Sequence, residues 1–185
     1  MTTRLFLLTG NPGVGKTTLL HKIIARWRGP TGGFTTEEVR PDARRQGFKL
    51  ITLDGQSTII AGTDVHTKHR LGRINVDVDA IERVGVPALE RALELGGLIV
   101  IDEIGKPELL SSDFVDVLHR IIEKDQPVLA TLMLGYHEEI DALMKHPDAR
   151  VIQVTQANRN ELVHQIAADL RPFESAARPE PAETP

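Results

Sequence analysis

Residues 10–17 read GNPGVGKT and match the pattern G-x-x-x-x-G-K-[ST] at every fixed position. The apolar run 5–9 comes directly before them and predicts a buried strand. Residues 16–27 follow directly and repeat apolar side chains at three- and four-residue spacing, which predicts a helix that Gly29 and Pro30 end. Because glycines let backbone N–H groups turn inward and the helix start adds a positive dipole end, the segment predicts a phosphate-binding loop (P-loop).

The residues of this loop have distinct expected roles. Lys16 is expected to reach the β- and γ-phosphates of a nucleotide, and the hydroxyl of Thr17 is expected to bind Mg²⁺. A glycine-rich turn that only happens to precede a helix is the alternative, and the strand and helix on its two sides argue against it. The other expected nucleotide-binding residues are Gly10, Asn11, Pro12, Gly13, Val14, Gly15 and Thr18.

A second apolar run, residues 98–101, ends in the acidic pair Asp102 and Glu103. Ligands of parallel α/β sheets bind at the carboxyl ends of the strands, so the pair is expected at the same sheet edge as the P-loop. Asp102 is expected to hold Mg²⁺ through a water, and Glu103 to orient and deprotonate an attacking water. The alternative is a solvated acidic pair at a strand end. If Glu103 is a base beside water, the site favours hydrolysis of the nucleotide over phosphoryl transfer to a second substrate.

The remaining pattern predicts one domain, residues 1–172, with an α/β fold: a mostly parallel sheet, helices on both faces and an added β-hairpin. Pro87 fits the first turn of a helix, and Ser111 or Ser112 fits an N-cap. Residues 173–185 are rich in Pro, Glu and Ala and are expected to form a disordered tail. The expected strands are 47–54, 57–61, 98–101, 128–132 and 151–154, and the later helices are 87–95, the segment after 111, and 160–170.

The composition limits the ligand classes and the cellular location that we expect. The chain has 185 residues and a formal charge of −4, so nucleic acid is not an expected ligand unless a local basic patch exists. Absence of cysteine excludes disulfides and thiolate chemistry and fits a reducing compartment. We find no signal-peptide core and no apolar run long enough for a membrane span, so the expected location is the cytosol.

Four segments in order, GNPGVGKTT, GGFTTEEVR with ARRQGF, IDEIGKPELLSSDF and VTQANRNEL, resemble the cancer-related, or thermophilic, nucleoside-triphosphatase family over residues 3–170. The resemblance implies a monomeric, RecA-like P-loop protein that uses Mg²⁺ to hydrolyse ATP, GTP, CTP and UTP to diphosphate and phosphate, with little base selectivity. It implies that Asp102 is the Walker B aspartate, that Glu103 is the base, and that Lys106 faces the transferred phosphate.

The chain departs from the family pattern at two places. Pro107 stands where the family usually has methionine, and Pro41-Asp42-Ala43 replaces a more glycine-rich turn before Arg44 and Arg45. The two arginines are candidates for the positive charge that stabilises phosphoryl transfer, with a surface pair as an equal alternative.

Several weaker candidates each have a structural alternative. Residues 35–40 are placed to touch the γ-phosphate or metal, or form a charged loop. Arg159 is placed to stack on a base or reach a phosphate, whereas Asn158 and Glu161 around it fit a capping box. Thr131 is either a γ-phosphate sensor or a buried strand residue. The last group, Asp64, His66 and His69, has metal-like spacing but is better explained as a solvated loop.

Two other functions remain open at this point. A nucleoside or nucleotide kinase needs an acceptor site and usually an arginine-rich lid, which residues 55–78 have room for. A nucleotide-dependent switch needs only slow hydrolysis that times a partner interaction. The guanine-selective N-K-x-D pattern is absent in strict form, in agreement with loose base selectivity.

Overall fold

A computed structural model describes residues 3–42 and 45–176. Within them the chain forms one nine-stranded sheet with the strand order β5-β6-β4-β3-β2-β7-β8-β1-β9. The strands are β1 (Leu5–Thr9), β2 (Thr31–Asp42), β3 (Arg45–Thr52), β4 (Ser57–Gly62), β5 (His69–Leu71), β6 (Ile74–Val76), β7 (Leu98–Ile104), β8 (Val128–Leu132) and β9 (Ala149–Gln153). The helices are α1 (Lys16–Ile24), α2 (Val78–Ala80), the π-turn η1 (Ile81–Gly85), α3 (Val86–Leu95), the 3₁₀ turn η2 (Glu108–Leu110), α4 (Ser112–Ile122), α5 (Glu138–Met144) and α6 (Arg159–Ala176).

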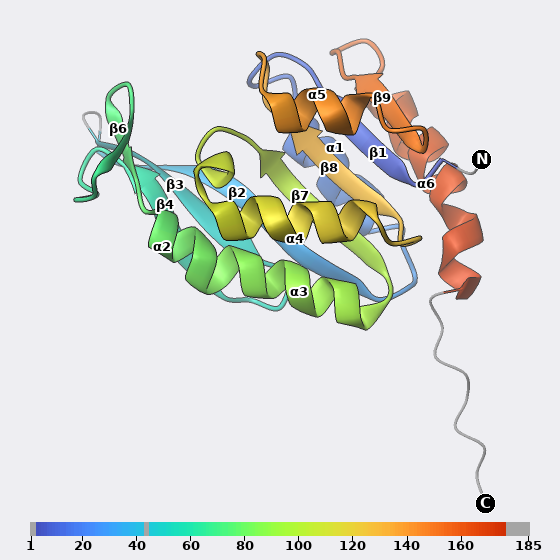
Figure 1. Cartoon of the computed structure of the whole chain (residues 1–185). Helices are drawn as coiled ribbons and strands as arrows, with labels where there is room; N and C mark the ends of the chain where they lie inside the picture. Colours follow the sequence, from blue (N-terminus) through green and yellow to red (C-terminus); the bar gives the residue numbers. More distant parts are fainter. Residues whose placement is uncertain (1–2, 43–44, 177–185) are drawn as a thin grey trace, which may run out of the picture.

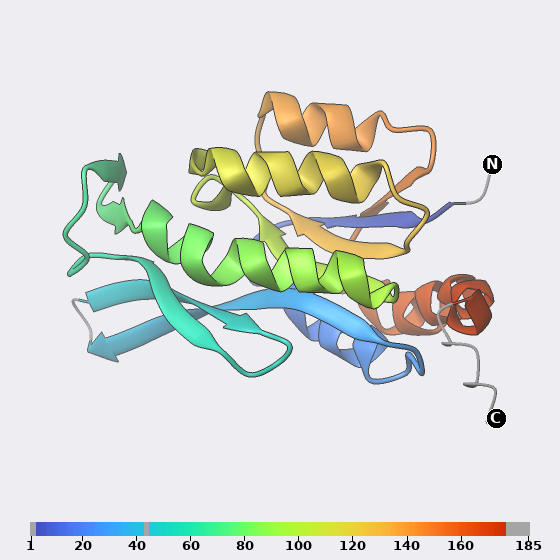
Figure 2. The same ribbon diagram turned by 60° about the horizontal axis from the view of Figure 1, so that its bottom comes forward.

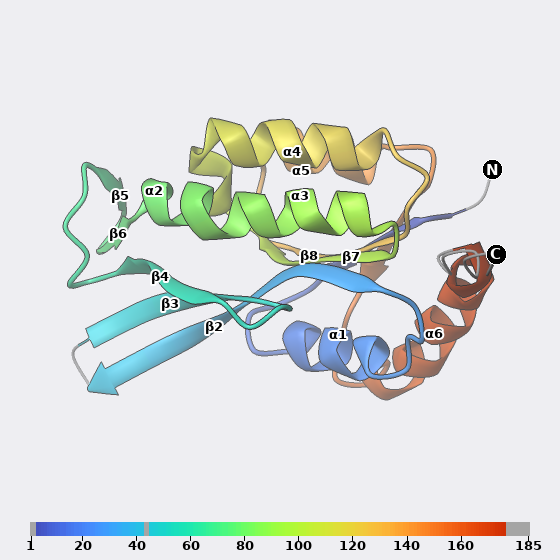
Figure 3. The ribbon, with the colours of Figure 1, turned by 90° about the horizontal axis from the view of Figure 1, so that it is seen from below.

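Helices cover both faces of the sheet, as Figures 1 and 3 show. Leu5 and Leu7 of β1 pack into the core under α3, α4 and α5, whereas Phe6 and Leu8 pack into the core over α1 and α6. This alternation follows from the two-residue side-chain period of a strand, and apolar residues on both faces mark a strand covered on both sides. The expected RecA-like P-loop fold is confirmed.

The parallel part of the sheet runs β2-β7-β8-β1-β9. β8 lies between the P-loop strand β1 and the acidic strand β7, so the loop after β1 and the acidic pair of β7 reach the same edge with one strand between them. This spacing leaves room for a phosphate tail between them.

The added antiparallel part is larger than expected. β3 and β4 form the predicted hairpin, and β3 also pairs with β2. We expected residues 35–40 to follow the first helix either as a segment that touches the γ-phosphate or as a charged loop. Instead they belong to β2, which pairs parallel with β7 up to Thr35 and antiparallel with β3 from Phe34 onward. Figure 2 shows β2 and β3 extending together beyond the parallel strands. Partner strands, rather than alternating apolar residues, hold this half of β2.

Two expected helix starts are confirmed. Pro87 lies in the first turn of α3, although the chain is already helical from Val78 through α2 and the π-turn. Ser111 is the N-cap of α4 and accepts a hydrogen bond from the Phe114 N–H. The strands β5 and β6 and the helix α5 were not anticipated.

The last helix continues past the expected domain end at residue 172. Pro172 lies inside α6, which ends at Ala176. The buried Leu170 anchors the preceding turn, and the Glu174 side chain accepts a hydrogen bond from the Arg28 N–H in the connection after α1. These contacts hold the last turn in place despite the missing proline N–H. No helix in the described ranges is long and apolar enough to cross a membrane.

Candidate active site

The P-loop takes the backbone conformation that its glycines permit. Gly13 and Gly15 have φ angles of 75° and 103°, in the left-handed region that residues with a Cβ rarely adopt. Gly15 is the N-cap of α1 and brings no side chain to cap the helix. The first-turn N–H groups therefore stay available to an anion at the positive end of the helix dipole.

Lys16 and Glu103, which the sequence assigns to phosphate binding and catalysis, lie together. The Lys16 ammonium donates a hydrogen bond to the Gly10 carbonyl at 3.0 Å and lies 3.7 Å from a Glu103 carboxylate oxygen. The Lys16 side chain is only 10% exposed. A phosphate tail in the loop offers this ammonium a stronger partner than the carbonyl, because charge-assisted hydrogen bonds exceed neutral ones.

Asp102 has one carboxylate oxygen held and one unsatisfied. The Thr131 hydroxyl donates a 2.5 Å hydrogen bond to Oδ1, while Oδ2 is buried and has no hydrogen-bond partner among the described residues. Burial raises the pKa of Asp102, and the Thr131 and Thr17 hydroxyls oppose that rise. Because an orphaned carboxylate oxygen beside a hydroxyl is a donor pair that hard cations prefer, Asp102 and Thr17 fit a divalent metal. Thr131 thus orients Asp102, whereas we had considered a contact with phosphate.

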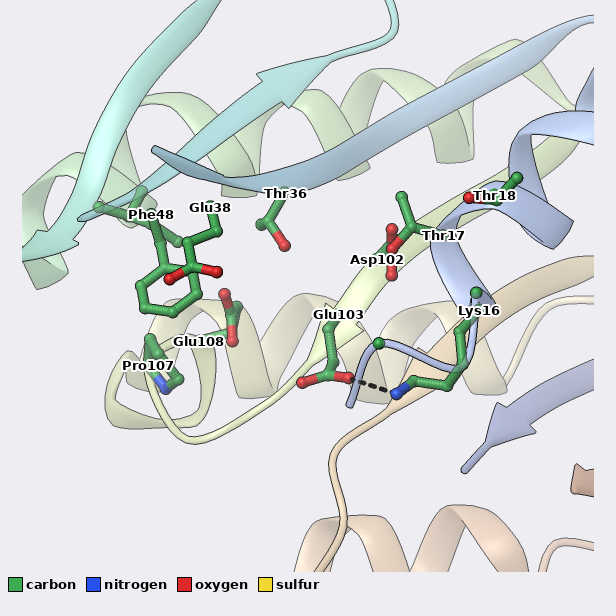
Figure 4. A pocket seen from close by; sticks show the side chains of 13 residues that line it. Lys16, Thr17, Thr18, Thr36, Glu38, Phe48, Asp102, Glu103, Pro107 and Glu108 are labelled. Atoms are coloured by element: carbon green, nitrogen blue, oxygen red, sulfur yellow. Dashed lines mark ion pairs between the residues drawn. The ribbon is translucent and has the colours of Figure 1, made fainter. Parts of the chain in front are cut away.

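Glu103 faces the P-loop across a cavity (Figure 4). Its side chain is 34% exposed, and the peptide bond that joins it to Asp102 is cis. Burial raises the pKa of Glu103; the neighbouring Lys16 lowers it and Asp102 raises it further. A carboxylate whose pKa lies above its usual range is a better proton acceptor, provided that a nearby cation keeps it ionised.

The cavity has a volume of about 500 Å³. It extends from the P-loop past the acidic pair to β3 and β4. Of the expected nucleotide-binding residues, Gly10, Asn11, Pro12 and Val14 belong to the loop but are not among its lining residues. Those lining residues are Gly13, Gly15, Lys16, Thr17, Thr18, Thr36, Glu38, Phe48, Ile60, Asp102, Glu103, Pro107 and Glu108.

Glu108 lines the cavity although it was not expected there, and the same holds for Phe48 and Ile60. Glu108 is 3% exposed, and its Oε2 accepts a hydrogen bond from the Gly105 N–H at 3.2 Å. Burial, with a smaller effect of Glu103, raises the pKa of Glu108 to about 8. A single glutamate in a turn looks like a surface residue in the sequence; its one distinguishing signal is its place in the segment after the acidic pair.

Among the other predicted cations, the structure places Lys106 and Arg159 outside the lining of this cavity. Lys106 is exposed and lies outside the lining residues. Arg44 lies outside the described residues, and of Arg45 only the backbone, at the start of β3, is described. Arg159 donates a hydrogen bond to the Val14 carbonyl at 3.1 Å and lines, with Gly15 and Thr18, a smaller pocket beside the P-loop.

The structure also bears on the capping box at Asn158 and on the metal-like spacing of residues 64–69. Asn158 does not form the expected capping box, because its side-chain oxygen accepts from the Thr155 N–H and its amide donates to the Gln153 carbonyl. Glu161 accepts instead from Gln165. No three His, Cys, Asp or Glu side chains gather as a metal site anywhere in the described part of the chain, so the spacing at residues 64–69 does not assemble one there.

The comparisons with known proteins agree on one family. A family model described as NTPase matches residues 5–167. The chain is 42% identical over 165 residues to the nucleoside-triphosphatase THEP1 of Thermotoga sp. (strain RQ2), covering 89% of this chain and 94% of that protein. The THEP1 of Methanocaldococcus jannaschii is 42% identical over 167 residues, with 88% and 94% covered.

Two solved structures are similar over the same region. The crystal structure of THEP1 from Aquifex aeolicus has a TM-score of 0.82 and 35% identity, covering 89% of this chain and 98% of that one. The solution structure of a human cancer-related nucleoside triphosphatase has a TM-score of 0.73 and 32% identity, covering 89% and 96%. Similarity of this extent in both sequence and fold shows that the chain is a nucleoside triphosphatase of the NTPase family.

Proposed function

We propose that this enzyme hydrolyses the terminal phosphate of Mg²⁺-bound ATP, GTP, CTP and UTP, giving the nucleoside diphosphate and phosphate. The observation that carries the proposal is the meeting of Lys16, Asp102 and Glu103 around one cavity at the carboxyl edge of the sheet. These groups supply a phosphate-binding cation, a metal-binding carboxylate and a base.

The order of events follows from the partners that each group has in the structure. Loop N–H groups and Lys16 bind the phosphate tail, which draws the ammonium from the Gly10 carbonyl. Thr17 and the free oxygen of Asp102 would hold the Mg²⁺, which would neutralise charge on the phosphates. Glu103 then orients a water and accepts its proton at a carboxylate oxygen.

Broad base selectivity is supported by what lies around the loop. Arg159, the predicted base-stacking residue, is engaged with the Val14 carbonyl, and the cavity lining consists of phosphate-side residues and the walls beyond Glu103. A monomeric state, a cytosolic location and roles for Arg44, Arg45 and Lys106 near the phosphate are further parts of this proposal; they derive from the composition and the family resemblance.

The test is release of inorganic phosphate from each of the four nucleotides with Mg²⁺. We expect Glu103→Gln to keep nucleotide binding and to lose turnover by about 100-fold or more, the usual contribution of a general base. Glu94→Gln, a change of the same kind at an exposed position, is the control. Hydrolysis by Glu103→Gln at the parent rate shows that another group is the base. Phosphate that moves to an added nucleoside, with none released, points to the kinase alternative.

A further inference from the structure

A second hollow lies away from the active site, where the ends of α1 and α6 meet. Its volume is about 720 Å³, against about 500 Å³ for the active-site cavity. The two helices contact each other on one face of the sheet, as Figure 3 shows. The connection after α1 leads to Thr31, which pairs with Leu98 at the start of β7, so the hollow lies at the sheet edge opposite the P-loop. We call it the rear hollow; its polar and aromatic lining residues are Arg26, Trp27, Arg28, His164, Arg171 and Glu174.

The lining of the rear hollow is positively charged, in contrast to the chain as a whole. Arg26, Arg28 and Arg171 supply three positive charges, and Glu174 supplies the one negative charge. This balance holds with His164 counted as neutral. The whole chain has a formal charge of −4, so the rear hollow is a local exception. A cluster of this sign attracts anions to this place rather than to the surface in general.

The guanidinium groups of the rear hollow are not neutralised by a carboxylate within the described residues. Arg26 donates to the Lys22 carbonyl at 2.8 Å, and this acceptor carries no net charge. The side chains of Arg28 and Arg171 have no hydrogen-bond or ion-pair partner in the described part of the chain. Glu174 accepts from the backbone N–H of Arg28, at 3.1 Å, rather than from a guanidinium. The rear hollow therefore keeps unused guanidinium N–H groups, which donate best to anionic oxygens.

The backbone that carries Arg26 and Arg28 is held by the residue between them. Trp27 packs against the core on the α1 side of the sheet, and its indole N–H donates to the Pro30 carbonyl at 2.9 Å. Gly29 lies directly against the indole, because a Cβ added there would come within 2.8 Å of the ring. The two arginines thus project from an anchored segment. Such preorganisation lowers the entropy cost of binding a ligand.

The size and charge of the rear hollow determine the kind of anion. Guanidinium groups bind phosphate oxygens in a fork geometry, and three of them around one hollow favour linked phosphates over a single phosphate. The volume lies within the range of small-molecule sites, about 300–1,000 Å³. A long polyanion such as RNA would extend onto a surface of net negative charge, which repels it. A compact oligophosphate avoids this repulsion.

We propose that the rear hollow binds a compact anion of two or more linked phosphates through Arg26, Arg28 and Arg171. The anion is either an inorganic oligophosphate or the phosphate tail of a second nucleotide. The lining contains neither the P-loop nor the acidic pair, so this binding does not depend on the proposed function.

Binding is tested on the full chain without Mg²⁺, by NMR titration with inorganic triphosphate. Trp27 is the only tryptophan in the chain, so its indole N–H gives a signal that reports on the rear hollow. We expect triphosphate to shift this signal and the Arg28 amide signal. We also expect it to bind at least about tenfold tighter than sulfate or orthophosphate, the effect of one further charge-assisted hydrogen bond. Equal affinity of the three anions, or unmoved signals at both residues, refutes the proposal without the need for any variant.

Variants separate the rear hollow from the P-loop, because triphosphate also resembles the tail that the P-loop is proposed to bind. Arg28→Gln and Arg171→Gln are each expected to weaken the triphosphate effect at Trp27 about tenfold, because each removes a charged donor. Lys16→Ala is expected to keep this effect at the parent affinity. Loss of the effect in Lys16→Ala assigns it to the P-loop and overturns the proposal.

Arg83→Gln is the matched control. Arg83 is exposed, has no ion-pair partner among the residues that the structure describes, and lies in η1, whose Ile81 packs into the core on the other face of the sheet. The control removes the same charge from the chain and is expected to bind triphosphate like the parent. If Arg28→Gln and Arg171→Gln behave like this control, the rear hollow is not the site.

The source of the phosphates is distinguished in the Lys16→Ala protein, with ATP beside inorganic triphosphate. ATP that shifts the Trp27 signal with equal or higher affinity assigns the rear hollow to a nucleotide tail, and ATP that binds about tenfold more weakly assigns it to an inorganic oligophosphate. A single-stranded oligonucleotide that binds there more tightly than either probe makes nucleic acid the ligand and overturns the proposal. Absence of all hydrolysis overturns the proposed function but leaves these binding results standing.

Discussion

Replacement of Glu108 by glutamine is expected to change how stability depends on pH. The pKa of Glu108 is raised from 4.5 to about 8 in the folded protein, chiefly by burial. Below pH 4.5 both the folded and the unfolded chain hold this proton. Between pH 4.5 and 8 only the unfolded chain ionises, so the free energy of unfolding falls as the pH rises. Above pH 8 both states are ionised and the loss is complete.

The size of the effect follows from the shift. A shift of about 3.5 pKa units at roughly 1.36 kcal/mol per unit gives a loss of at most about 5 kcal/mol between these two pH values. That is a large part of a typical domain stability of about 5–15 kcal/mol. Glutamine cannot ionise, yet it keeps an oxygen that can accept from the Gly105 N–H. The Glu108→Gln protein is therefore expected to gain stability relative to the parent as the pH rises.

Urea unfolding of both proteins at pH 5 and at pH 8 measures this difference. The raised pKa values of Asp102 and Glu103 affect both proteins, so the comparison removes most of their contribution. Glu94→Gln, at an exposed helix position, is the control and is expected to follow the parent at both pH values. A constant difference between Glu108→Gln and the parent from pH 5 to pH 8 refutes the assignment of a buried, protonated Glu108.

Two further predictions concern binding. Lys16→Ala is expected to weaken the affinity for Mg-ATP about tenfold or more, because a charge-assisted hydrogen bond to phosphate is lost. Calorimetry measures this affinity, with the exposed Lys22→Ala as the control. Equal heats of binding for Lys16→Ala and the parent contradict the role of Lys16. Thr131→Val keeps the shape but leaves Asp102 Oδ1 without its donor, so we expect about 1–3 kcal/mol lower stability and a higher Mg²⁺ requirement for turnover. Unchanged Mg²⁺ dependence excludes Thr131 as the residue that orients Asp102.

The chemical centre of the site could be predicted because its signals are local. Lys16 and Thr17 follow a glycine pattern that fixes the loop, and Asp102 and Glu103 end an apolar strand whose carboxyl edge is known from the fold class. Ser111 as the N-cap of α4 is also a local signal, since the cap bonds within three residues. These predictions depend on neighbours in the chain and need no knowledge of distant contacts.

Other features depend on segments far apart in the chain. The charged half of β2 is a strand because β3 pairs with it, and Glu38 reaches the cavity only through that pairing. Arg159, whose contact with a nucleotide stays a prediction, donates a hydrogen bond to the Val14 carbonyl across 145 positions of sequence. Spacing along the chain carries no information about such partners.

The residue pattern alone was sufficient to identify the P-loop, the acidic pair and the two-sided α/β arrangement, because backbone geometry and side-chain periodicity act over a few residues. The strand order with β8 between β1 and β7, the burial of Glu108 and the part of the cavity beyond Glu103 arise only when the whole sheet assembles. Burial and electrostatic environment are properties of the packed chain, since they depend on which distant groups displace water from a side chain.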